Sequence, residues 1–148
     1  MEINKVNNLL ELFYNQYLTQ NKTSVFLQSL KEVEKKYSWE DVYSNVIKLS
    51  EEISKYIKKG DRCLLISENR SEWMISDLSI MLSGGITVPA YTTYTERDYE
   101  YIIDDCAPTV LIISDKMQYL KVKNIIPTLS FLKLFIIILH FLIHYILN

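Results

Sequence analysis

Apolar residues recur at helical spacing in some segments of the chain and form short continuous runs in others. The helical pattern is clearest in one stretch, whose apolar positions lie three or four residues apart: Trp39, Val42, Tyr43, Val46, Leu49, Ile53, Tyr56 and Ile57. Such spacing predicts a helix with one buried face. Ser38 and Asp41 resemble a capping box at its start. Gly60 is predicted to end it, with Lys58 and Lys59 in the last turn.

Four short runs rich in apolar and β-branched residues follow, at Cys63–Ile66, Ile86–Ala90, Val110–Ile113 and Leu134–Ile138. Runs of this kind are typical of strands that are buried on both faces, as in parallel sheets. Pro89 is predicted to end the second run, because proline has no N–H to give to a sheet.

Helical patterns separate these runs. One is predicted to begin at a capping Ser71, with inner residues from Trp73 to Leu82, and to end at Gly84. The next begins with Thr95 and Asp98 and cannot continue past Pro108. The last is predicted over residues 115–126. Alternation of this kind predicts an α/β fold with an open, mostly parallel sheet and helices on both faces.

The N-terminal part of the chain is less regular. Apolar spacing predicts a helix over residues 3–18, and residues 24–37 allow a short strand followed by a charged turn from Lys31 to Lys36.

Composition excludes some classes of function. The formal net charge is −2 and no basic stripe is present, which disfavours nucleic-acid binding. Cys63 and Cys106 lie in apolar surroundings without a CxxC pattern, which predicts buried, reduced thiols and a cytoplasmic setting. The first residues contain no continuous apolar segment typical of a signal peptide.

The residues that could bind nucleotides or act as nucleophiles form no complete set. No G-x-G-x-x-G or G-x-x-x-x-G-K-[ST] motif is present among only three glycines, and the adjacent Gly84 and Gly85 are better explained by a tightly packed helix end. Ser67, Ser71 and Ser83 would each need a nearby base to act as a nucleophile.

The histidines and paired carboxylates are no stronger candidates. His140 and His144 would share one face of a helix, but no third metal ligand is evident. The adjacent carboxylates Glu51–Glu52 and Asp104–Asp105 are expected to be solvated. Glu72, beside Trp73, is expected to complement the dipole of its helix.

Four segments resemble AMP-forming acyl-CoA synthetases, the adenylate-forming superfamily: Trp39–Val46, Gly60–Trp73, Gly84–Tyr91 and Tyr99–Pro108. The resemblance covers about residues 37–138, in the family's order and spacing. The forms Asn-Arg-Ser-Glu-Trp and Val-Pro-Ala-Tyr are most similar to long-chain fatty acyl-CoA ligases.

The resemblance implies a reaction in which a fatty acid and ATP give an acyl-adenylate, from which CoA then displaces AMP. This chemistry needs Mg²⁺ and a phosphate loop rich in Ser, Thr and Gly, and no such loop occurs in this sequence. The resemblance therefore assigns no catalytic, cofactor-binding or metal-binding residue here. Residues 1–138 are expected to be a partial N-terminal AMP-binding domain, incomplete and inactive alone.

Residues 139–148 are an apolar tail that departs from the family pattern. The preferred explanation is a truncated or shifted reading frame. Two alternatives stay open: a buried soluble end, and a helical membrane tail with membrane contact through Leu134–Leu147 and a cytoplasmic body.

Two further hypotheses of function remain beside an inactive ligase fragment. One is a non-catalytic α/β module that binds a small molecule or a partner, and the other is a tail-anchored membrane protein. An incomplete sheet would also have an unpaired edge and an uncovered apolar face, which predicts poor solubility.

Overall fold

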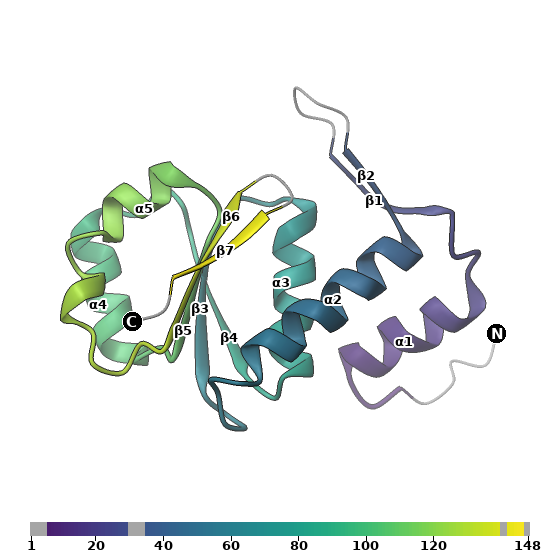
Figure 1. Ribbon diagram of the computed structural model, residues 1–148, viewed down its shortest axis with the longest axis horizontal. Helices are drawn as coiled ribbons and strands as arrows, with labels where there is room; N and C mark the ends of the chain where they lie inside the picture. Colours follow the sequence, from purple (N-terminus) through teal and green to yellow (C-terminus); the bar gives the residue numbers. More distant parts are fainter. Residues whose placement is uncertain (1–5, 30–34, 140–141, 147–148) are drawn as a thin grey trace.

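Helices and strands alternate along most of the chain in the computed structural model, which describes residues 6–29, 35–139 and 142–146 (Figure 1). The helices are α1 (Leu9–Thr19), α2 (Trp39–Ile53), α3 (Ser71–Leu82), α4 (Glu96–Cys106) and α5 (Lys116–Val122), followed by the 3-10 helix η1 (Ile126–Thr128). The strands are β1 (Val25–Ser29), β2 (Lys35–Ser38), β3 (Arg62–Ile66), β4 (Ile86–Ala90), β5 (Val110–Ile113), β6 (Leu134–Leu139) and β7 (Leu142–Ile146).

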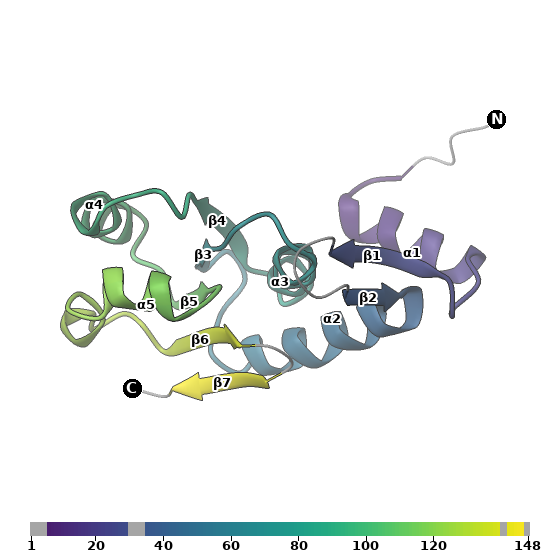
Figure 2. The same ribbon diagram turned by 90° about the horizontal axis from the view of Figure 1, so that it is seen from above.

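The main sheet has the strand order β4-β3-β5-β6-β7. Its first four strands are parallel, and β7 runs antiparallel to β6. A separate antiparallel pair, β1 and β2, lies beside α2 and away from the main sheet (Figure 2). The predicted α/β fold with a mostly parallel sheet is confirmed.

Helices cover both faces of this sheet (Figure 1). Cys63 and Leu65 of β3 pack in a cluster with residues of α2 and α3, whereas Leu64 and Ile66 pack with residues of α4 and α5. Successive side chains of a strand point to opposite faces, so a strand between two helical layers must be apolar at every position. The uncovered apolar face expected from the sequence is therefore not found over β3 and β5, where Cys63–Ile66 and Val110–Ile113 are buried.

The predicted caps are confirmed in two helices and wrong in one. Ser38 and Thr95 form capping boxes with Asp41 and Asp98. Ser71 does not cap α3: Arg70 occupies the N-cap position without a side-chain hydrogen bond, and Ser71 is buried.

Helix α2 ends at Ile53, earlier than predicted, so Lys58 and Lys59 do not belong to its last turn. Tyr56 and Ile57 still pack against the sheet, although the chain around them is no longer helical. The apolar spacing of the sequence continues past the end of α2 because Tyr56 and Ile57 pack against the same apolar cluster as the helix. Here the spacing indicates which residues are buried, not that the backbone is helical.

Other boundaries also differ. Helix α1 begins at Leu9, capped by Asn8, and α5 ends at Val122 instead of reaching Ile126. Leu82, predicted on the inner side of α3, is 43% exposed.

Pro89 does not end β4, which continues to Ala90. The N–H of Ile86 donates to the carbonyl of Asp61, next to β3, at 2.8 Å. Alternate residues of a strand turn their N–H groups in opposite directions, so position 89 faces the free edge of this outermost strand. Proline is tolerated there because it removes no bond of the sheet, and it makes the edge a poorer template for another strand.

Lys35 and Lys36 belong to strand β2 rather than to the predicted charged turn, whose residues 31–34 lie outside the described residues. β2 pairs with β1, and Tyr37 is buried between this hairpin and α3. Strand β2 contains one apolar residue, Tyr37, so its sequence has no apolar periodicity. The strand forms because it pairs with β1, which the local sequence pattern does not specify.

The apolar C-terminal segment forms strands, not the helix that the membrane-tail alternative requires. Leu134–Leu139 and Leu142–Ile146 pair with each other in antiparallel register. Within the described ranges, none of the helices has the length and hydropathy needed to cross a membrane.

Gly84 and Gly85 join α3 to β4 for two different reasons. Gly84 has a φ of +84°. A Cβ on Gly85 would lie 3.1 Å from Ile80 Cγ2 and 3.2 Å from Cys63 Sγ. The predicted tightly packed helix end is confirmed.

We expect Gly84→Ala to lower the free energy of unfolding by about 1 kcal/mol, because alanine is strained in the left-handed region. Gly84→Asn should cost less, since asparagine tolerates that region. At Gly85 the order should reverse, because crowding grows with side-chain size. Urea unfolding of the four variants measures the loss of stability for Ala and Asn at each position. If Gly84→Asn is no more stable than Gly84→Ala, the positive φ is not the reason for glycine at this position.

Candidate functional site

A cleft of about 640 Å³ lies at the carboxyl ends of β3 and β4. One wall is the β3–α3 connection with the first turn of α3, and it contributes Ser67, Glu68, Asn69 and Trp73. The other wall is the end of β4 with the β4–α4 connection, and it contributes Pro89, Ala90, Tyr91 and Thr92. Open parallel sheets bind their ligands at this end of the strands, and the volume suits a small molecule.

Polar contacts from α4 and α5 hold the second wall. The hydroxyl of the fully buried Tyr99 donates to the carbonyl of Tyr91 at 2.8 Å and lies 3.2 Å from Gln118 Oε1. Lys121 Nζ donates to the carbonyls of Thr92 (2.5 Å) and Tyr94 (3.0 Å). Burial, assisted by the charge of Glu68, raises the pKa of Tyr99 to about 12, so its hydroxyl stays protonated as a donor.

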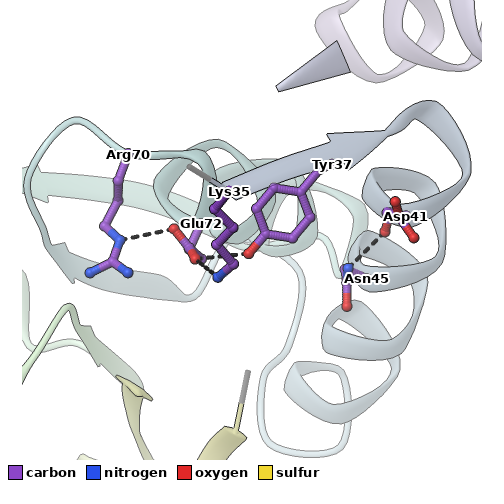
Figure 3. A network of polar contacts seen from close by, with 6 residues as sticks. All are labelled: Lys35, Tyr37, Asp41, Asn45, Arg70 and Glu72. Carbon is purple, nitrogen blue, oxygen red and sulfur yellow. Dashed lines mark hydrogen bonds and ion pairs between the residues drawn. The ribbon is translucent and has the colours of Figure 1, made fainter. Parts of the chain in front are cut away.

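Glu72, in the first turn of α3, organises a network beside the first wall (Figure 3). Arg70 Nε donates to Glu72 Oε2 at 2.9 Å, and the Tyr37 hydroxyl donates to Oε1 at 2.8 Å. Lys35 forms an ion pair with the same Oε1. The carboxylate thus fastens the β1–β2 hairpin to α3.

The protonation equilibria of this network follow from burial and hydrogen bonding. Burial alone would raise the pKa of Glu72, but the bonds from Arg70, Lys35 and Tyr37 outweigh it and lower the pKa to about 2. Burial and the neighbouring carboxylate raise the pKa of Tyr37. Glu72 is therefore ionised and Tyr37 neutral at pH 7. The sequence predicted the helix-dipole position of Glu72 but not these partners.

The three candidate serine nucleophiles are not brought together. Ser67 lines the cleft, but its hydroxyl donates to the carbonyl of Glu68 at 3.0 Å. Ser83 donates to the carbonyls of Ser50 and Ser79, which ties α3 to α2. Ser71 is buried at the start of α3.

The other candidates also form no catalytic group. His144 lies in strand β7, so the shared helix face predicted for the two histidines is wrong there, and His140 lies outside the described residues. No cluster of three potential metal ligands occurs in the part of the chain that the structure describes. Asp104, Asp105 and Glu51 are exposed, as expected, whereas Glu52 is partly buried and forms an ion pair with Lys55.

Both cysteines are buried free thiols, as predicted. Burial, with a contribution from Asp61, raises the pKa of Cys63 to about 12. Burial likewise raises the pKa of Cys106. Both sulfurs are therefore held as neutral thiols.

The sequence did not predict the cleft, because Trp73, Tyr91 and Thr92 come from two strand ends that only the sheet brings together. Their positions in the sequence could have indicated the cleft. Each of these residues lies shortly after a predicted strand, where parallel sheets have their ligand-binding loops.

A parallel sheet with this strand order and helices on both faces defines a doubly wound α/β class of fold. The AMP-binding enzyme family model matches residues 15–140. The chain therefore belongs to the AMP-binding enzyme family, and the resemblance noted in its sequence is confirmed.

Several curated relatives are long-chain-fatty-acid–CoA ligases. FadD15 of Mycobacterium tuberculosis is 36% identical over 59 residues, which are 40% of this chain and 10% of the relative. The Bacillus subtilis ligase is 29% identical over 94 residues, which are 62% of this chain and 17% of the relative. The chain thus spans less than a fifth of the length of either protein.

Solved structures share the fold. The anthranilate CoA ligase AuaEII, in complex with anthranoyl-AMP, superposes with a TM-score of 0.74 at 20% identity, over 84% of this chain and 24% of the other. The R395G mutant of coronafacic acid ligase from Pectobacterium brasiliense gives 0.77 at 16% identity, over 86% and 25%.

Proposed function

We propose that this chain is part of the N-terminal scaffold of a long-chain fatty acid–CoA ligase and does not carry out the reaction alone. The observation that carries the proposal is the parallel series β4-β3-β5-β6, in the region matched by the AMP-binding enzyme model. The names of the curated relatives supply the substrate class. In this proposal residues 1–138 are the partial AMP-binding domain, and residues 139–148 are an added segment.

The chemistry of adenylation supports a scaffold role. Transfer of an adenylyl group requires donors and cations that stabilise charge on phosphate oxygens. The family resemblance implies ATP, Mg²⁺ and CoA for the complete enzyme. This sequence has three glycines and no Ser/Thr/Gly-rich phosphate loop. Glu68 is acidic, and the other described residues that line the cleft are neutral.

We expect the purified chain to release no pyrophosphate from ATP when Mg²⁺ and palmitate are supplied, with or without CoA. The physical reason is that the sequence has no Ser/Thr/Gly-rich phosphate loop to stabilise the charge that develops during adenylyl transfer. A coupled pyrophosphate assay measures the rate, the full-length Bacillus subtilis ligase is the positive control, and circular dichroism verifies folding. Release above background that depends on palmitate would overturn the proposal.

A second candidate function is a non-catalytic small-molecule-binding module, favoured by the cleft at the carboxyl ends of β3 and β4. Saturable binding without pyrophosphate release would support it.

A further inference from the structure

The cleft between the β3–α3 and β4–α4 connections has a composition unlike that of a site for anions. Of the described residues that line it, Glu68 alone is charged. Phosphates and carboxylates are bound by Arg, Lys or helix N-terminal N–H groups, and Arg70 beside the cleft already commits its Nε to Glu72. The described residues that line the cleft thus supply a carboxylate and include no lysine or arginine.

Aromatic side chains line the same cleft from its two walls. Trp73 is half-buried, and Tyr91 is 72% exposed, with its ring edge-on to that of Tyr94 at a centroid distance of 5.6 Å. Flat π-surfaces attract organic cations and stack against planar groups. Pro89 adds further apolar surface.

The polar groups of the cleft are available to a ligand. Among the described residues, the carboxylate of Glu68 and the amide of Asn69 have no side-chain hydrogen bond or salt bridge. The charge of Glu68 does act on Arg70 and Tyr99 at longer range. A carboxylate without a hydrogen-bond donor, next to aromatic rings, favours a cation that donates N–H bonds.

The walls are also held in place before any ligand arrives. Tyr99 and Lys121 bind the backbone of the β4–α4 connection, and Glu72 binds the β3–α3 connection through Arg70. Rigid walls reduce the ordering cost of binding.

We propose that this cleft binds a flat organic cation, such as an aromatic amidine or amine, with its ring against Trp73 and Tyr91 and its N–H groups on Glu68. The proposal does not depend on the ligase role, because it concerns a ligand of opposite charge to the fatty acid, ATP and CoA.

Three probes of nearly the same shape test the charge preference: benzamidine (cationic), benzamide (neutral) and benzoate (anionic). Titration followed by ¹H–¹⁵N NMR of the whole chain gives both the affinity and the location. Benzamidine should shift the amides of Glu68, Asn69, Tyr91 and Thr92 and bind most tightly, and benzoate should leave them unshifted.

Two variants with matched controls complete the test. Glu68→Gln should weaken benzamidine binding about tenfold, since one charge-assisted hydrogen bond is lost, whereas Glu51→Gln on α2 should not. Tyr91→Ala should weaken it several-fold by removing the stacking surface, whereas Tyr101→Ala, equally exposed on α4 at 73%, should not. Equal binding of benzoate, shifts spread over other residues, no binding of benzamidine at millimolar concentration, or unchanged binding by both cleft variants would each overturn the proposal.

Discussion

Ile112→Ala is expected to lower the free energy of unfolding by about 2–5 kcal/mol, the range for removing a large aliphatic side chain from a rigid core. Ile112 is fully buried in β5, the central strand of the sheet. It pairs in register with Leu65 on one side and Ile136 on the other. Because strands flank it and helices pack above it, the cavity cannot readily collapse. A domain of this size has only about 5–15 kcal/mol of stability in total.

The matched control removes the same atoms from an exposed place. Ile86 is 53% exposed at the start of the edge strand β4, so Ile86→Ala should cost less than about 1 kcal/mol. Urea unfolding followed by circular dichroism compares the two variants with the unmodified chain. Equal losses would contradict the placement of β5 at the centre of the sheet.

Glu72→Gln is expected to lower the free energy of unfolding by about 2 kcal/mol, because Lys35 and Arg70 lose their shared carboxylate while remaining largely covered. Their side chains are 17% and 25% exposed, which keeps the cost below that of a fully buried charge. The β1–β2 hairpin should also separate more easily from α3, which hydrogen exchange at the amides of β2 would measure. Glu51→Gln, at an exposed position of α2, is the control and should change neither quantity.

The same carboxyl group makes stability depend on pH in a definite direction. Folding lowers its pKa from the ordinary value of 4.5 to about 2. The stabilisation is therefore complete above about pH 4.5 and is lost as the pH falls toward 2. Glu72→Gln should have a smaller loss of stability than the unmodified chain across this interval. Identical pH profiles would show that the network contributes nothing to folding.

The patterns that predicted the fold correctly were those with a local physical cause. Continuous apolar runs marked β3, β5 and β6 because both faces of these strands are covered. The capping boxes at Ser38 and Thr95 marked helix starts because each depends on residues three positions apart. The predicted end of α2 was wrong because the apolar residues Tyr56 and Ile57 pack against the core although they lie beyond the last residue of the helix.

The amino-acid sequence by itself determined the alternation of strands and helices, the burial of the central strands on both faces, and the family. These properties follow from burial patterns, helix caps and the order of segments, which neighbouring residues encode. Only the tertiary structure decided what depends on residues far apart in the chain. Lys35 meets Glu72 through docking of a hairpin whose second strand has no apolar period. Trp73 and Tyr91 come to line one cleft because parallel pairing aligns the carboxyl ends of β3 and β4. Contacts of this kind depend on strand pairing and helix packing over the whole sheet. No local sequence pattern specifies that pairing or packing.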